Sequence, residues 1–246
     1  MLSGLELLIA LTAVFVGATI MGTVSFGLAL VVAPVLLLFL APQSVVVIAN
    51  AIIIVLLALV LLRVRQHLNV RLVGGMVLGG LAAVPLGVLA LRSADPTTLR
   101  IAIGVVILIL GILILLNVQI PLARHRLAGP VFGFLASLSI TTLSIGGPLA
   151  AIYVIAQRWT PPVMRASLAF FFLATYILAF ALYAAAGLVD RATLANVGLL
   201  APGLLAGFGL ASLIVSRINE SMFRYAALAV IITGSVVLLG RELLRL

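Results

Sequence analysis

From Leu7 to Leu62 the sequence contains no Asp, Glu, Lys, Arg or His, and nearly every side chain in this stretch is apolar. Exposure of such a run to water is unfavourable. A lipid bilayer requires it, because a helix that crosses a hydrocarbon core about 30 Å thick needs roughly 20 apolar residues. The whole chain is 65% hydrophobic and 8% charged, against about 25% charged residues in soluble domains. The sequence therefore predicts an all-α polytopic membrane protein that crosses the lipid bilayer several times.

Charged and turn residues divide the chain into two long apolar segments, each followed by three shorter ones. As one straight helix, the first long segment would measure about 54 Å at 1.5 Å per residue, which is too long for one crossing. We therefore expect both long segments to be broken or re-entrant. In chain order the segments are Leu5–Leu40, Ser44–Leu62, Leu72–Leu91 and Thr97–Leu116, then Leu127–Gln157, Ala166–Val189, Thr193–Val215 and Met222–Gly240.

The repeated order predicts two homologous halves, residues 1–120 and 121–246. Ser25 and Pro34 in the first half match Ser139 and Pro148 in the second, with the same spacing. If each long segment returns to the side from which it enters, most arginines gather on one side of the membrane, as the positive-inside tendency requires. The halves are then an inverted repeat, an arrangement typical of secondary transporters, and the arginine-rich side faces the cytoplasm.

Both long segments carry a small polar patch inside apolar sequence, and these patches are the candidate substrate site. Broken helices at membrane depth persist only in protein or beside a wet cavity, and their free N–H groups, hydroxyls and helix dipoles bind anions without a full positive charge. Asn50, within its own segment, is a further candidate, with interhelical bonding as its alternative role. The candidate substrate-binding residues are Gly22, Thr23, Ser25, Gly27, Asn50, Ser139, Thr141, Thr142, Ser144, Gly146 and Gly147.

Other roles for these residues remain open at this stage. Any single Ser or Thr in a membrane helix often serves packing alone, by bonding to a backbone carbonyl. An intramembrane enzyme would need a buried nucleophile with its base or a metal constellation, and the sequence offers neither, so we expect no catalytic residue, metal or cofactor. A non-transporting structural or assembly subunit of a membrane complex is the alternative function. The charged residues, which give a net charge of +9, lie at the ends of the apolar segments, and this placement argues against nucleic acid as a partner. Whether the protein forms a homo-oligomer is left open.

The pattern of glycines and prolines also resembles a known family. In the first half it consists of Gly17, Gly22, Gly27 and Pro34, followed by Pro42. In the second half it consists of Gly133 and Ser144-Ile145-Gly146-Gly147-Pro148, followed by Pro161-Pro162 and Arg165. From about Leu7 to Leu239 the chain resembles the sulfite exporter TauE/SafE family of membrane permeases, although Thr23, Val24 and Ser25 replace the adjacent glycines usual in the first patch. The resemblance implies transport of small anions, often sulfur oxyanions or organosulfonates, across the cytoplasmic membrane.

Overall fold

The computed structural model describes residues 2–115, 125 and 128–214, and every regular element within these ranges is a helix. This confirms the predicted all-α class; the predicted segment Met222–Gly240 lies outside the described residues. The elements in chain order are α1 (Gly4–Val24), α2 (Leu28–Leu36), α3 (Pro42–Val64), the short 3₁₀ helix η1 (Arg65–His67), α4 (Val70–Ser93), α5 (Pro96–Leu115), α6 (Ala128–Leu143), α7 (Gly147–Ala156), α8 (Pro161–Ala185) and α9 (Arg191–Ile214).

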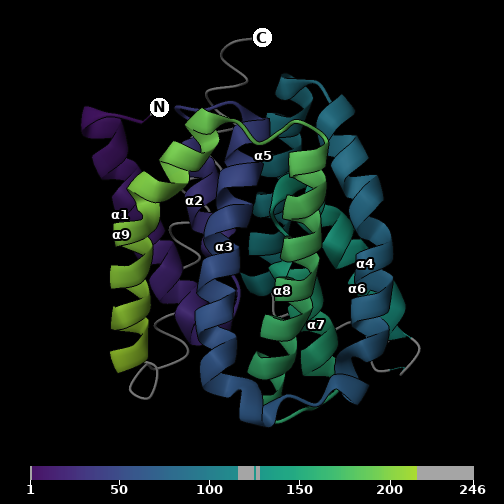
Figure 1. Cartoon of the computed structure of the whole chain (residues 1–246). Coiled ribbons are helices and arrows are strands. Elements are labelled where there is room, and N and C mark those ends of the chain that lie inside the picture. The colour runs from purple at the N-terminus through teal and green to yellow at the C-terminus, as the bar shows by residue number, and fades with distance from the viewer. Residues whose placement is uncertain (1, 116–124, 126–127, 215–246) are drawn as a thin grey trace.

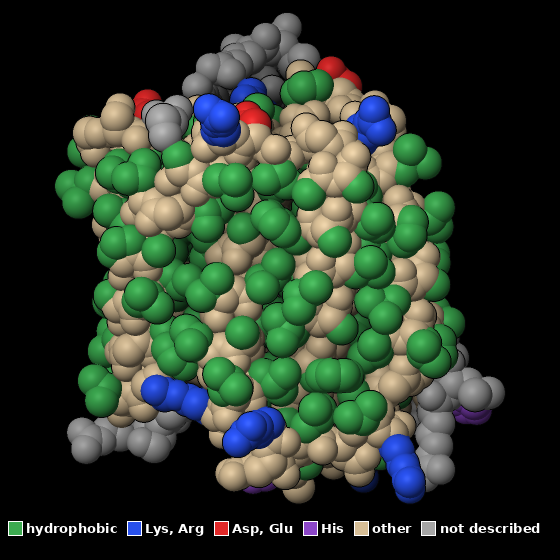
Figure 2. Space-filling view, viewed as in Figure 1, with side chains coloured by type: hydrophobic (Ala, Val, Ile, Leu, Met, Phe, Trp, Pro, Cys, Tyr) green, Lys and Arg blue, Asp and Glu red, His purple; other side chains and the backbone are tan. Residues whose placement is uncertain are grey.

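Within the described ranges, five helices are long and apolar enough to cross a membrane. They are α1, α3 together with η1, α4, α8 and α9. Large apolar side chains on these helices face outward, with Leu78 71% and Leu213 74% exposed, and Figure 2 shows hydrophobic side chains over most of the height of the molecule. Such a continuous apolar surface matches lipid rather than water. The protein is therefore a multi-pass membrane protein.

Prolines and capping side chains set the helix starts. α3, α5 and α8 each begin with proline, whose missing N–H is harmless at a first helical position. The Asp95 carboxylate accepts the Thr97 and Thr98 amides at 3.0 Å each. Asp190 accepts the Thr193 amide at 2.6 Å, and its hydrogen bonds with Thr193 lower the pKa of this exposed carboxyl. Prolines and aspartate caps thus define where these helices begin.

Helices at corresponding places in the two predicted halves run in opposite directions. In Figure 1, α3 starts at the upper end of the bundle and finishes at the lower end, whereas α8 starts at the lower end. α4 rises while α9 descends. Two parallel pairs join the halves: Gly203 and Gly207 of α9 lie against the Leu11 and Phe15 carbonyls of α1, and α4 lies along α6 in the same manner. Each half therefore packs one of its helices along the broken segment of the other half.

The two ends of the bundle differ in charge. At the end where α3 finishes and α8 begins, the described residues include Arg63, Arg65, Arg71, Arg158 and Arg165, with no Asp or Glu. We call this the arginine-rich end. At the opposite end, Arg92, Arg100 and Arg191 are accompanied by Glu6, Asp95 and Asp190. Arginine side chains close the lower edge of the apolar surface in Figure 2.

Candidate functional site

Each of the two polar patches coincides with a gap between helices. The first break, Ser25–Gly27, separates α1 from α2, and the second, Ser144–Gly146, separates α6 from α7. Ser25 (φ 69°) and Ser144 (φ 61°) both adopt the left-handed conformation, which costs a non-glycine residue about 1–2 kcal/mol. Their amides donate to the Met21 and Ile140 carbonyls, at 2.7 Å in each case. Both preceding helices therefore end with the same local geometry.

The short helices that follow the breaks begin with unpaired amides. Gly27 precedes α2 with φ 107°, a backbone conformation that favours glycine. Gly146 precedes α7. Within the described part of the chain, the amides of Gly27, Leu28, Gly146 and Gly147 donate no hydrogen bond. These free N–H groups carry the positive ends of two helix dipoles.

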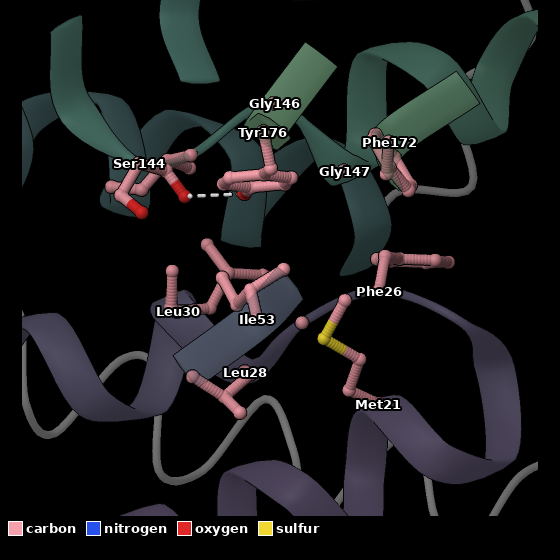
Figure 3. Close-up of a pocket in the computed structure, with 13 residues that line it drawn as sticks. Met21, Phe26, Leu28, Leu30, Ile53, Ser144, Gly146, Gly147, Phe172 and Tyr176 are labelled. Atoms are coloured by element: carbon pink, nitrogen blue, oxygen red, sulfur yellow. Dashed lines mark hydrogen bonds between the residues drawn. The ribbon is translucent and has the colours of Figure 1, made fainter. Parts of the chain in front are cut away.

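The two helix starts face one cavity. It has a volume of about 20 Å³, which is room for a single water molecule. In Figure 3, Ser144, Gly146 and Gly147 lie on one side of it, and Met21, Phe26 and Leu28 on the other. Ile53 of α3, with Phe172 and Tyr176 of α8, completes much of the apolar wall. The cavity thus combines backbone donors from both halves with apolar walls from the two central helices.

Four of the predicted site residues line this cavity: Gly27, Ser144, Gly146 and Gly147. Two more are fully buried without lining it. The hydroxyl of Ser25 and both polar atoms of the Asn50 amide are buried without a partner among the described residues, as is the Ser144 hydroxyl. An unsatisfied buried polar group costs about 1–3 kcal/mol. A bound ligand would supply the missing hydrogen bonds, so these groups are typical of a binding site. Asn50 precedes Ile53 by one turn of α3 and shares its face.

The other predicted residues make contacts between or within helices. The Thr23 hydroxyl donates to the Ile20 carbonyl at 2.7 Å, and the Thr141 hydroxyl donates to the Ser137 carbonyl at 2.8 Å. The Thr142 hydroxyl donates to the Gly87 carbonyl of α4 at 3.3 Å. These three hydroxyls are already paired and lie outside the cavity lining.

Gly22 and Ser139 contribute backbone carbonyls. The Gly22 carbonyl accepts from Arg165, and the Ser139 carbonyl accepts the Ile145 amide at 3.3 Å, which fixes the second break. At Gly22, a Cβ atom would also stand 2.6 Å from the Ala211 side chain of α9. Neither residue lines the cavity. Their observed contacts stabilise the fold, and their roles as substrate ligands stay predictions.

Two tyrosines of α8 that sequence reasoning missed hold the second broken segment. The Tyr176 hydroxyl donates to the Ser144 carbonyl at 3.3 Å, and the Tyr183 hydroxyl donates to the Thr141 carbonyl. Both tyrosines are buried. They stand two helical turns apart on one face of α8, and this spacing of hydroxyls in an apolar segment is the signal that could have identified them.

One of three comparisons with known proteins finds a match. No match to the chain is found among curated proteins or among solved structures. A family model described as "Sulfite exporter TauE/SafE" matches residues 9–238, which include both breaks and every residue that lines the cavity. The matched region is nearly the whole chain, and the protein therefore belongs to the TauE/SafE family of membrane sulfite exporters.

Proposed function

We propose that this protein is a secondary transporter for a small anion, a sulfur oxyanion or organosulfonate such as sulfite, which binds in the cavity between the two breaks. The observation that carries this proposal is the convergence of two helix N-termini on one cavity, with the amides of Gly27, Leu28, Gly146 and Gly147 unpaired. A negatively charged oxygen is the natural partner of such amides. The unpaired Ser144 hydroxyl adds one further donor.

The uncharged character of the site suits release as well as binding. An N–H group bonded to a charged oxygen contributes roughly 1.5–3 kcal/mol, so several of them select an oxyanion. Among the residues that the structure describes, no Arg, Lys or His lines the cavity, and a full charge at membrane depth is itself costly. Binding that rests on dipoles and hydrogen bonds stays weak enough for the anion to leave on the opposite side of the membrane.

We further propose that the halves 1–120 and 121–246 form an inverted repeat. The opposed directions of α3 and α8 support it. So does a constant sequence separation between matching features, since Ser25 matches Ser144, Gly27 matches Gly146, and Pro42 at the start of α3 matches Pro161 at the start of α8. The helix breaks thus align Ser25 with Ser144 instead of Ser139, five residues from the match drawn from sequence. Ile53 and Phe172, both at the cavity, match at the same separation.

The size of the cavity implies that transport requires movement. A space for one water molecule is too small for an oxyanion with three or four oxygens, so the breaks must separate to admit it. In an inverted repeat, one half rocks against the other and opens the site alternately to either side. The apolar contacts between Phe26 of the first break and Gly147 of the second then form and break in each cycle.

The arginine-rich end faces the cytoplasm in this proposal, with the protein in the cytoplasmic membrane. The chain contains no cysteine, so single cysteines report their own position. In intact cells, we expect Arg65→Cys and Arg158→Cys to resist an impermeant thiol reagent, and Arg92→Cys to react. Labelling of Arg158→Cys from outside, with Arg65→Cys protected, would show that each long segment crosses once and would reject the inverted repeat.

Flux into liposomes tests the transport function. Purified protein should carry sulfite, sulfate, thiosulfate or an organosulfonate faster than protein-free vesicles. We expect Ser25→Ala combined with Ser144→Ala to lower the rate about tenfold, the effect of losing one hydrogen bond to a charged group. Thermal stability should change little, because neither hydroxyl has a partner in the structure.

Ser212→Ala is the matched control. The Ser212 hydroxyl donates to the Phe208 carbonyl within α9 at 2.7 Å, and Ser212 does not line the cavity, so its loss should leave flux unchanged. A wild-type protein that moves none of these anions would refute the proposal. A double Ser variant with wild-type flux would remove the two serines from the site while leaving transport itself intact.

A further inference from the structure

Arg165 lies near the start of α8, yet its side chain reaches the end of α1. One terminal nitrogen of its guanidinium, Nη2, donates to the Gly22 carbonyl at 3.0 Å. Its Nε is buried and has no partner among the described residues. A guanidinium carries five N–H donors in a planar fork that fits two oxygens of an oxyanion at once. Arg165 therefore retains at least one unused donor, the buried Nε–H.

A second arginine approaches the same place from α3. The guanidinium carbon of Arg63 stands 4.7 Å from the centre of the Phe208 ring of α9, a cation–π geometry that holds the side chain over the ring. Phe208 in turn lies beside Gly22, because a Cβ atom at Gly22 would be 3.6 Å from the Phe208 ring. Arg165 thus contacts the last turn of α1 directly, whereas Arg63 lies near this turn only through the Phe208 ring. We call Arg63 and Arg165 the arginine pair.

The arginine pair lies next to the cavity on one side only. Met21, which immediately precedes Gly22, lines the cavity, so the pair borders the cavity wall toward the arginine-rich end. In the first half, Val46 of α3 occupies the position that matches Arg165 of α8, and Val46 is fully buried. Among the described residues, the first half therefore has no arginine at the position that matches Arg165.

We propose that the arginine pair is a second binding station for the transported oxyanion, on its path between the cavity and the arginine-rich end. The inference rests on the transport function proposed above. The arriving anion replaces the Gly22 carbonyl as acceptor from Arg165 and approaches Arg63 at the edge of the Phe208 ring. The carbonyls at the end of α1 carry partial negative charge, and the Gly22 carbonyl accepts from Arg165 again once the anion leaves. This competition keeps the affinity of the second site for the anion low.

Transport measured separately from each face tests the station. With sulfite as the probe, Arg63→Gln and Arg165→Gln should each raise the KM about fivefold to tenfold when sulfite is offered at the arginine-rich face, by loss of one charge-assisted contact. The KM for sulfite offered at the opposite face should stay within about twofold. Both variants should also weaken the dependence of this KM on ionic strength, because screening acts on the charges that were removed.

Three further variants complete the design. Arg165→Lys keeps the charge without the planar fork and should recover part of the loss. Arg71→Gln removes an exposed arginine at the same end and should leave both KM values unchanged, as should Arg191→Gln at the opposite end. Arg63 is exposed, so Arg63→Gln retains the fold even if Arg165→Gln does not.

The possible failures are distinct. Absence of flux by the wild-type protein would refute the transport function itself. Flux by the wild-type protein together with an unchanged KM at the arginine-rich face in Arg63→Gln would overturn the arginine pair alone. An equal rise of KM at both faces would also overturn it, since it would place these residues at the central site.

Discussion

Gly133→Ala is expected to destabilise the protein by about 3 kcal/mol or more, the upper range for forcing extra volume into a packed interior. In the contact between α4 and α6, a Cβ atom at Gly133 would overlap the backbone carbonyl of Met76. Gly79 is equally close to the backbone of Pro130. Backbone atoms cannot rotate away as a side chain can, so the two helices must separate. Loss of the folded peak in detergent size-exclusion chromatography, or a large fall in Tm, measures the effect.

Gly74→Ala in α4 and Gly198→Ala in α9 are the matched controls. No atom lies within 4 Å of a Cβ atom built at either position, and alanine favours a helix over glycine by up to about 1 kcal/mol. Both variants should keep or slightly raise the Tm. If Gly133→Ala matched these controls, the close contact of α4 with α6 would be wrong.

Gly147→Ala is expected to lower transport about tenfold or more while the protein stays folded. Its Cβ atom would stand 2.8 Å from the Cβ atom of Phe26, so the first break must move away from the second to make room. The unpaired amides at the two helix starts then no longer face the same point, and about 1.4 kcal/mol of lost binding corresponds to a tenfold effect. Liposome flux measures the rate, and the Tm in detergent reports the fold.

Phe26→Gly supplies the decisive second variant, because the Cβ atom of Phe26 is itself the nearest contact and alanine would retain it. Alone, it opens space at the cavity and should alter flux modestly. Combined with Gly147→Ala, it removes the steric conflict, so the double variant should transport faster than Gly147→Ala does. Such non-additivity is the signature of direct contact between two residues. Strictly additive effects would mean that the two breaks do not touch across the cavity.

Sequence alone was sufficient for the membrane class and for most helix boundaries. A helix that crosses lipid must be long and apolar, so apolar runs in the sequence predict such helices. Prolines at positions 42, 96 and 161 mark the residues where three helices begin. The positions of the breaks were also within reach. Glycine and serine interrupt apolar sequence at Ser25–Gly27 and Ser144–Gly146, where the helices stop. Gly27, Ser144, Gly146 and Gly147, which lie at these breaks, line the cavity; their role in binding substrate stays a prediction.

The remaining site residues were harder to identify, for a physical reason. Membrane helices are apolar on all sides, so hydrophobic periodicity does not distinguish the face toward lipid from the face toward a cavity. Ile53 and Phe172 line the cavity, yet nothing in their neighbourhood marks them. The Thr141 and Thr142 hydroxyls donate to the Ser137 and Gly87 carbonyls, whereas the Ser144 hydroxyl has no partner among the described residues. Spacing in the chain does not reveal which hydroxyl lacks a partner.

The small volume of the cavity between the two breaks has a consequence for proton conduction across the membrane. Proton conduction needs a continuous file of hydrogen-bonded water, and a chamber for one molecule, walled by Ile53, Phe172 and Leu28, cannot contain such a file. If the protein is the transporter proposed above, this cavity alone offers protons no path across the membrane while it is empty.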